Sequence, residues 1–275
     1  MANIYTLRAF LFGQWSSDVR LDGKTVIITG ANTGIGKETT RDLAKRGARI
    51  IMACRDISKA EAAQKEITEE SGNQNIVIRK LDLADTKSIR EFAEIVNRGN
   101  ANPDYILGHF LLTFLLIDLL KKSAPSRIII LSSMAHSWGT INLDDINSER
   151  SYHSRRVYGQ SKLANILCAR SLAKRLADTG VTVYAVHPGI VRTELKRHMN
   201  LGLLFLWKVV RPFTKTIVQG AQTSVYCAVE PALQSESGGY YSNCGPSSCT
   251  RAARDDEMAQ KLWELSCQML GITWD

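Results

Sequence analysis

The chain has 275 residues with 44% hydrophobic content, which is enough for one large domain with its own core. It contains no internal repeat, low-complexity tract or interdomain linker, which excludes a repeat array. The formal charge of +8 favours an acidic partner, such as a phosphorylated ligand or an anionic membrane surface. Nucleic acid is disfavoured, because the basic residues are dispersed and no binding motif accompanies them.

The chain is expected to consist of a short apolar N-terminal segment, residues 1–20, and one domain, residues 21–275. The apolar run at residues 4–15 is shorter than the roughly 20 residues that a membrane-spanning helix needs. It also lacks a clear cleavage site, so it is not interpreted as a signal peptide.

A β-branched run at residues 24–29 leads into a glycine-rich turn and then into an amphipathic stretch that ends near Gly47. This order predicts a strand, a tight turn and a helix. Glycines allow the backbone to approach a pyrophosphate closely, and the helix N-terminus offers free amides and the positive end of its dipole. The turn therefore predicts a dinucleotide site, with contacts from Gly30, Asn32, Thr33, Gly34, Ile35 and Gly36.

The second expected strand, residues 49–54, ends about twenty residues after the glycines, where an acidic side chain would bind the ribose 2′-hydroxyl of NAD. No acid occupies that position. Arg55 follows the strand instead, and a guanidinium suits a 2′-phosphate, so NADP is favoured over NAD, with Lys37 as a second cation. The alternative for Arg55 is a surface ion pair with Asp56.

Helical and strand patterns alternate along the rest of the chain. Residues 127–131 and 182–186 are continuous apolar runs, typical of strands buried on both faces of a parallel sheet. The expected fold is therefore α/β, a Rossmann-like doubly wound parallel sheet in a single domain. Residues 111–120 are also apolar, but the run is short and contains Asp118, which favours a packed helix.

Tyr158 and Lys162 lie four positions apart, so on a helix both side chains project from one face. An ammonium group beside a phenol stabilises the phenolate and lowers a phenol pKa from about 10 toward the range that a general acid or base needs. The pair alone has a simpler interpretation as a solvated helix face. Its position downstream of a dinucleotide turn favours a catalytic pair.

With these motifs the sequence resembles the short-chain dehydrogenase/reductase family, and within it the retinol dehydrogenase branch. Further matching motifs extend the resemblance over nearly the whole chain, at residues 81–85, 107–110, 132–133, 187–193 and 262–271. The resemblance implies that Ser133, Tyr158 and Lys162 are catalytic. It implies that the cofactor is held by Gly30, Gly34, Gly36, Arg55, Asp82, Lys162 and Thr193.

The chemistry implied is reversible hydride transfer. Tyr158 would donate a proton to a carbonyl oxygen as the carbon receives hydride from NADPH, and the reverse reaction oxidises an alcohol. Ser133 would hydrogen-bond the same oxygen and fix its position. A serine hydrolase is disfavoured, because neither a Gly-x-Ser-x-Gly elbow nor an ordered triad is present. By resemblance the substrate is a lipophilic small molecule of the retinal or retinol type.

One segment departs from the family pattern. The family has a buried fourth strand ending in Asn-Asn-Ala-Gly, and then a loop, before the helix that here begins near Leu107. In this chain the polar run at residues 98–104 leads directly to that helix, so the family's fourth strand is expected to be missing. Residues 104–107 could replace it, but Pro103 and the immediate start of the helix leave little room.

The loss of a central strand would leave backbone amides and carbonyls unpaired in the core, each at a cost of roughly 1–3 kcal/mol. The family asparagine that positions Lys162 aligns here with Tyr105, which cannot replace it. Two hypotheses follow. The first is an NADP-dependent oxidoreductase of a lipophilic aldehyde or alcohol, and the second is a catalytically impaired splice-type variant that acts through association with membranes or intact subunits.

The apolar stretch at residues 201–207 is flanked by basic residues and includes Trp207, a pattern typical of peripheral membrane contact. A lid over the substrate pocket is the alternative. By resemblance the helix at residues 111–120 contributes to a homodimer. The expected location is the endoplasmic reticulum membrane or the cytoplasm.

The six cysteines do not indicate an oxidising compartment, since Cys54, Cys168 and Cys227 lie in strand or helix patterns that favour small apolar residues. Cys244 and Cys249 could form a local disulfide or half of a metal site. No His or Cys spacing completes such a site, so no metal is expected. His109 and His187 belong to the family motifs and are expected to be structural.

Overall fold

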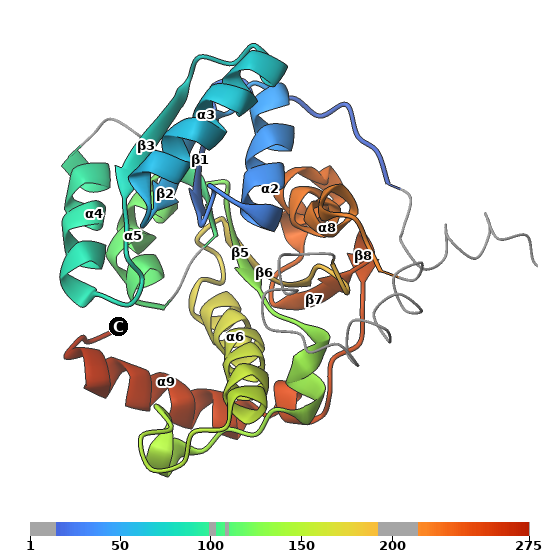
Figure 1. The fold of residues 1–275 in the computed structure, drawn as a ribbon. Coiled ribbons are helices and arrows are strands. Elements are labelled where there is room, and N and C mark those ends of the chain that lie inside the picture. The colour runs from blue at the N-terminus through green and yellow to red at the C-terminus, as the bar shows by residue number, and fades with distance from the viewer. Residues whose placement is uncertain (1–14, 99–102, 108–109, 192–213, 275) are drawn as a thin grey trace, which may run out of the picture.

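Runs of β-branched and apolar residues form the central sheet of the protein, which a computed structural model describes for residues 15–98, 103–107, 110–191 and 214–274. The strand order is β3-β2-β1-β4-β5-β6-β7-β8, with neighbours parallel except for the antiparallel pair β7 and β8 (Figure 1). The strands are Thr25–Thr29 (β1), Arg49–Cys54 (β2), Ile76–Lys80 (β3), Pro103–Leu107 (β4), Ser126–Leu131 (β5), Val181–His187 (β6), Gly239–Ser242 (β7) and Gly245–Pro246 (β8).

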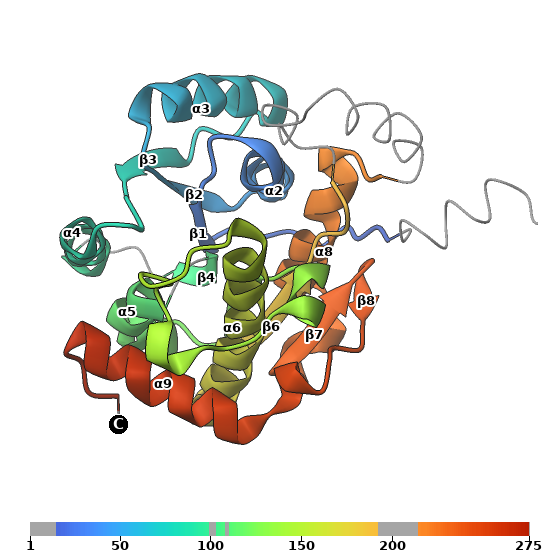
Figure 2. The same cartoon turned by 60° about the horizontal axis from the view of Figure 1, so that its bottom comes forward.

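Helices cover both faces of the sheet (Figures 1 and 2). Strand residues alternate between two core clusters, because successive side chains of a strand point to opposite faces. Val26 and Ile28 pack in one cluster, and Ile27 packs in the other. The first cluster lies under α2 (Gly34–Lys45), α3 (Ile57–Ser71) and α8 (Ile217–Val229). The second lies under α4 (Thr86–Arg98), α5 (Phe110–Lys122), α6 (Ser154–Arg175) and α9 (Asp256–Leu270).

The α/β doubly wound fold expected from the sequence is confirmed by this arrangement. The chain runs from β1 outward to β3 and then returns to place β4 on the other side of β1. The order of the strands therefore reverses between β1 and β4. In open parallel sheets, ligands bind at such a switch point, outside the carboxyl ends of the strands.

The prediction that the fourth strand is missing was wrong. Pro103–Leu107 forms β4, which pairs with β1 on one side and β5 on the other. Pro103 fits because it is the first residue of the strand, opposite Thr25, where the register shifts before the pair of Val26 with Tyr105. The helix does not begin at Leu107 either, since α5 starts at Phe110. The physical reason for β4 is that β1 and β5 would otherwise leave their backbone groups unpaired in the core.

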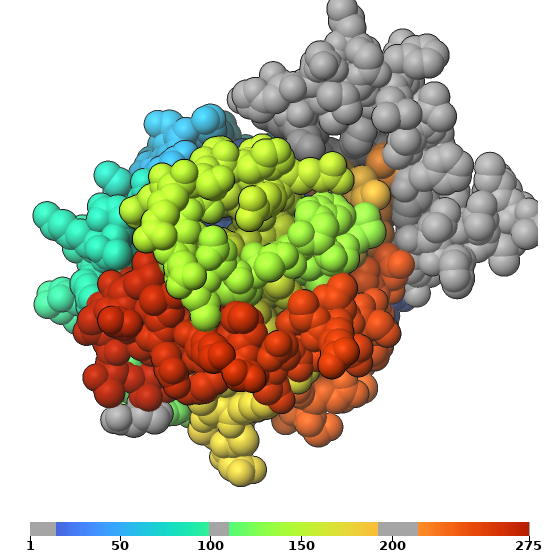
Figure 3. All heavy atoms as spheres, turned by 90° about the horizontal axis from the view of Figure 1, so that it is seen from below, coloured from blue at the N-terminus to red at the C-terminus, as the bar shows by residue number. Residues whose placement is uncertain are grey.

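The C-terminal helix α9 packs against α6 and closes one side of the molecule. In Figure 3 the red helix lies beside the yellow-green segment that connects β5 to α6. Trp263 of α9 contacts both Phe110 of α5 and Trp274, with ring centroids 4.7 and 4.8 Å apart. These aromatic contacts join the end of the chain to the start of α5.

The two apolar segments considered for membrane contact, residues 4–15 and 201–207, lie outside the described residues, apart from Trp15. Among the helices that the structure describes, none combines the length and apolar character needed to cross a bilayer. The helix expected to contribute to a homodimer, α5, buries Leu112, Leu116 and Leu120 within its own domain. The homodimer stays a prediction.

Candidate functional site

The glycine-rich turn after β1 has a shape that only glycine supports. Gly30 and Gly34 have positive φ angles of 63° and 55°, a region that other residues rarely adopt. A Cβ on Gly36 would lie 2.3 Å from the carbonyl oxygen of Gly30. The start of α2 therefore packs directly on the backbone of Gly30, whereas the space beside Gly30 and Gly34 is open to the close approach of a ligand, as a pyrophosphate site requires.

The same turn leads directly into the N-terminus of α2. Thr33 is the N-cap residue, but its side chain makes no capping hydrogen bond, and the first turn of the helix contains no acidic residue. The first amides of the helix, which begins at Gly34 and Ile35, therefore face the turn with the positive end of the helix dipole. Asn32 donates from Nδ2 to the carbonyl oxygen of Asp56 at 3.5 Å, which ties the turn to the end of β2.

Arg55 follows β2 at the same edge of the sheet and is exposed. Its expected alternative partner, Asp56, is paired with Lys59 at 2.8 Å and also caps α3. Within the described part of the chain, no acidic group lies within ion-pair distance of Arg55. Lys37, in contrast, has an ion-pair partner, because its ammonium is paired with Glu66 at 2.5 Å. Arg55 is thus the better placed of the two cations to meet a phosphate.

Asp82 follows β3 and completes the series of predicted cofactor residues along the edge formed by β1, β2 and β3. The amide of Leu81 donates to the carbonyl oxygen of Cys54 at 3.0 Å, which holds this segment beside the end of β2. The carboxylate of Asp82 accepts from the amide of Ala84 at 3.0 Å. Its own amide donates to Ser88 Oγ at 3.0 Å, so the turn before α4 is fixed.

Tyr158 and Lys162 lie on α6, as their spacing predicted. The Lys162 ammonium is 5.5 Å from the centroid of the Tyr158 ring. Burial lowers the pKa of the Lys162 ammonium from its usual value. Half of the Tyr158 surface is exposed, so its hydroxyl is not sealed inside the protein. The pair has the geometry of a phenol with a cation beside it.

Ser133 lies just past the carboxyl end of β5, where its Oγ accepts from the amide of Ala135 at 3.2 Å. The preceding residue, Ser132, donates to the carbonyl oxygen of Lys162 at 2.7 Å. This bond joins the end of β5 to the helix that carries the Tyr158 pair. The fold therefore brings the three predicted catalytic residues to one edge of the sheet, the edge that also carries the glycine turn.

Two side chains at this edge were not singled out by the sequence. Asn165 donates from Nδ2 to the carbonyl oxygen of Leu131 at 2.8 Å, and the Lys162 ammonium donates to the same oxygen at 3.5 Å. The spacing of seven from Tyr158 places Asn165 on the same helix face, which is the signal that could have found it. Lys215 is 3% exposed, and its ammonium has no hydrogen-bond partner among the described residues.

Other predictions concern residues away from the glycine turn. His187 was expected to be structural, and its Nδ1 accepts from the amides of Met134 and Gly189, both at 3.3 Å. Cys244 and Cys249 are free thiols, so the local disulfide considered for them is not formed. Thr193 lies outside the described residues, and its contact with a cofactor stays a prediction.

Models of known families match most of the described chain. Residues 24–101 match the family described as short chain dehydrogenase, and residues 117–221 match the one described as Enoyl-(Acyl carrier protein) reductase. Residues 102–116, which include the end of the polar run at residues 98–104 and the strand β4, fall between the two matches.

Curated relatives align with almost the whole chain. Retinol dehydrogenase 12 of Homo sapiens is 48% identical over 292 residues, with 97% of this chain and 92% of the relative covered. Retinol dehydrogenase 11 of Mus musculus is 46% identical over 289 residues, with 96% and 91% covered. Since 97% of 275 residues is about 267, about 25 of the 292 positions aligned with retinol dehydrogenase 12 have no counterpart in this chain.

Solved structures share the fold. An uncharacterized protein from Mycobacterium paratuberculosis has a TM-score of 0.70 and 31% identity, with 93% of this chain and 96% of that chain covered. L-sorbose reductase from Gluconobacter frateurii, solved with NADPH and L-sorbose, has a TM-score of 0.66 and 18% identity, with 82% and 96% covered. Together with the sequence relatives, these matches show that the chain belongs to the short-chain dehydrogenase/reductase family and is an oxidoreductase of its retinol dehydrogenase branch.

Proposed function

We propose that this protein is an NADP-dependent oxidoreductase that interconverts a lipophilic aldehyde and its alcohol, of the retinal and retinol type. The observation that supports this most directly is the position of the Lys162 ammonium, 5.5 Å from the Tyr158 ring, on the helix joined to the Ser133 segment. The names of the curated relatives support a retinoid substrate.

A nicotinamide cofactor fits the residues at the switch point of the sheet. The open space at Gly30 and Gly34, where an added Cβ would meet nothing within 4 Å, and the uncapped N-terminus of α2 suit a pyrophosphate. Arg55, which is exposed and lacks an ion pair in the described part of the chain, suits the 2′-phosphate that distinguishes NADP from NAD. The NADPH in the structure of L-sorbose reductase supports the same choice. NADPH would supply the hydride.

Each of the three side chains has a separate role in this proposal. Tyr158 donates its hydroxyl proton to the carbonyl oxygen in reduction and accepts it back in alcohol oxidation. Ser133 donates a hydrogen bond to the same oxygen and holds it in place as negative charge develops. Lys162 stabilises the phenolate that remains on Tyr158, because a cation beside a phenolate favours the charged form.

A second candidate is an impaired variant of such an enzyme, which would act through association with membranes or intact subunits. It is favoured by the gap of about 25 aligned positions relative to retinol dehydrogenase 12. Contact with a membrane surface and a homodimer rest on the sequence alone.

Two measurements on the purified chain test these candidates. NADPH binding is followed by its fluorescence, and turnover by the retinal-dependent loss of NADPH. We expect binding, turnover, and a decrease in kcat/KM of about 10²- to 10⁴-fold in Tyr158→Phe, because the proton donor is removed. Tyr152→Phe, an exposed tyrosine just before α6, is the matched control and should keep full activity. A folded chain that binds no NADPH, or a Tyr158→Phe variant with unchanged turnover, would overturn the proposal.

A further inference from the structure

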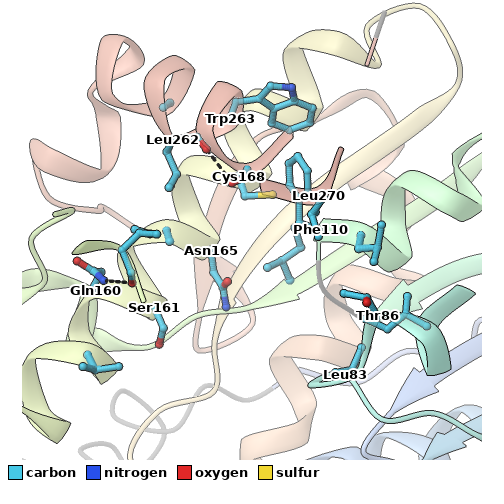
Figure 4. Close-up of a pocket in the computed structure, with 18 residues that line it drawn as sticks. Leu83, Thr86, Phe110, Gln160, Ser161, Asn165, Cys168, Leu262, Trp263 and Leu270 are labelled. Atoms are coloured by element: carbon cyan, nitrogen blue, oxygen red, sulfur yellow. Dashed lines mark hydrogen bonds between the residues drawn. The ribbon is translucent and has the colours of Figure 1, made fainter. Parts of the chain in front are cut away.

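A cavity of about 390 Å³ lies between α4, α5, α6 and α9 (Figure 4). Small-molecule sites in proteins have volumes of about 300–1,000 Å³, so this cavity is large enough for an organic ligand. None of Ser133, Tyr158 and Lys162 is among the described residues that line it. The cavity adjoins the proposed catalytic pair without being lined by it, since Asn165, which does line the cavity, shares the carbonyl oxygen of Leu131 with Lys162.

One end of the cavity is aromatic and aliphatic. Phe110 from α5 and Trp263 from α9 meet edge to face there, with ring centroids 4.7 Å apart. Leu262 and Leu270 of α9 extend the same wall, and Figure 4 shows Cys168 of α6 pointing between Leu262 and Phe110. Such a surface gains free energy by covering apolar atoms, at roughly 25 cal/mol for each Å² removed from water.

The other end presents hydrogen-bond acceptors. The amide nitrogen of Asn165 is engaged with the carbonyl oxygen of Leu131, so the side chain turns its oxygen to other donors. Ser161 donates its hydroxyl proton to the carbonyl oxygen of Tyr158, and its oxygen keeps the capacity to accept. Both side chains point toward the cavity in Figure 4. A ligand group that donates a hydrogen bond, such as a hydroxyl, matches this end.

The absence of charge on the described lining side chains indicates that the ligand is uncharged. All eighteen described residues that line the cavity have uncharged side chains at neutral pH. The Cys168 thiol stays protonated, because burial raises its pKa to about 12. A carboxylate placed here would lose its hydration without gaining a cation, at a cost of several kcal/mol. A neutral molecule has no charge to remove from water, so it binds without this free-energy cost.

We propose that this cavity is a binding site for an uncharged lipophilic alcohol, whose apolar body lies against Phe110 and Trp263 and whose hydroxyl donates to Asn165. The site goes beyond the proposed function, since it requires neither a cofactor nor Tyr158. Three features of the cavity support the proposal, namely its volume, its apolar wall and the hydrogen-bond acceptors at its opposite end.

The test uses the full chain without cofactor and two probes that share one apolar skeleton. Retinol carries a hydroxyl, and retinoic acid carries a carboxylate at the same end. Binding is measured by quenching of protein fluorescence and confirmed by equilibrium dialysis. We expect saturable binding of one retinol per chain and at least tenfold weaker binding of retinoic acid. Equal affinity for both probes, or no saturable binding of retinol, would overturn the proposal.

A cavity-filling variant locates the bound probe. Ala164 lies on α6 and lines the cavity, so Ala164→Phe is expected to weaken retinol binding at least tenfold. Ala232→Phe, at an exposed position outside the cavity, is the matched control and should bind as the unchanged chain does. Thermal unfolding checks that both variants fold, and the comparison of the two probes needs no variant.

The same experiment separates this site from the proposed active site. Tyr158→Phe is expected to bind retinol in the cavity as well as the unchanged chain does, whether or not the chain shows turnover. If the Ala164→Phe variant binds retinol as tightly as the unchanged chain, the probe binds elsewhere and the cavity site is refuted. The proposed enzymatic function would not be affected by that result.

Discussion

His187 connects the end of β6 to the segment that carries Ser133. Its Nδ1 accepts hydrogen bonds from the amides of Met134 and Gly189, so this nitrogen must be unprotonated in the folded protein. Burial, and then the positive charge of Lys215, lower the pKa of His187 to about 4 from the usual 6.5. A single imidazole thereby fixes the loops at the carboxyl ends of β5 and β6, where the proposed chemistry takes place.

This arrangement predicts a loss of stability in mild acid. Between pH 6.5 and about 4 the unfolded chain binds a proton at His187 and the folded chain does not. The stability from this group is therefore fully present above pH 6.5 and is lost as the pH falls through the folded pKa. We expect the free energy of unfolding to fall by about 1–3 kcal/mol more between pH 7 and 4.5 than in a chain without this imidazole.

The comparison variant is His187→Asn, whose side-chain oxygen can accept in place of Nδ1 but does not titrate in this range. Urea unfolding of both chains at a series of pH values isolates the contribution of His187 from that of the carboxylates. Parallel stability curves for the two chains would show that His187 binds protons equally in the folded and unfolded states, and would contradict the prediction.

At the scale of elements, the sequence predicted the strands that carry their own pattern. Residues 24–29 and 49–54 became β1 and β2 because β-branched runs fit a sheet that is buried on both faces. The segment Pro103–Leu107 has no such pattern, and its strand is determined by neighbours that are distant in sequence. The sequence offered residues 104–107 only as an alternative with little room, because the driving force for this strand comes from the unpaired backbone groups of β1 and β5 and not from its own pattern.

The same limit applies to the site. The spacing of Tyr158 and Lys162 was sufficient to place them on one helix face. The hydrogen bond from Asn165 to the carbonyl oxygen of Leu131 joins α6 to β5. Because every residue has a backbone carbonyl group, the residue types in the sequence do not identify this partner. The cavity is likewise formed by four helices, β5 and connecting segments that meet only in the folded chain.

The insertion of β4 predicts the pattern of hydrogen exchange. If β4 pairs on both sides, the amides of β1 and β5 are interior to the sheet and should exchange as slowly as those of β2. We expect Ile106→Pro, which removes an amide from the middle of β4, to reduce protection in both β1 and β5. Val77→Pro in the edge strand β3 is the control and should affect β2 but not β5. Fast exchange along β1 and β5 in the unchanged chain would show that β4 is not seated between them.

For the whole molecule, the cavity adjoins the short connection between β4 and α5. About 25 positions of retinol dehydrogenase 12 have no counterpart here, and β4 is followed by α5 after only two residues. Phe110, the first residue of α5, lines the cavity together with residues of α6 and α9. The space beside α6 is therefore bounded by the residue that directly follows this short connection.

Lengthening this connection gives a test at the scale of the domain. We expect a graft of the retinol dehydrogenase 12 segment between Leu107 and Phe110 to fill the cavity and raise Tm by about 4 °C or more, which corresponds to roughly 1–2 kcal/mol for a domain of this size. The graft should also weaken the binding of retinol in the cavity, because the inserted residues would take the place of the ligand. A flexible Gly/Ser insertion of equal length is the control, since it lengthens the connection without supplying apolar side chains. An unchanged or lower Tm in the graft, with retinol still bound, would mean that the cavity and the shortened connection are independent features of the chain.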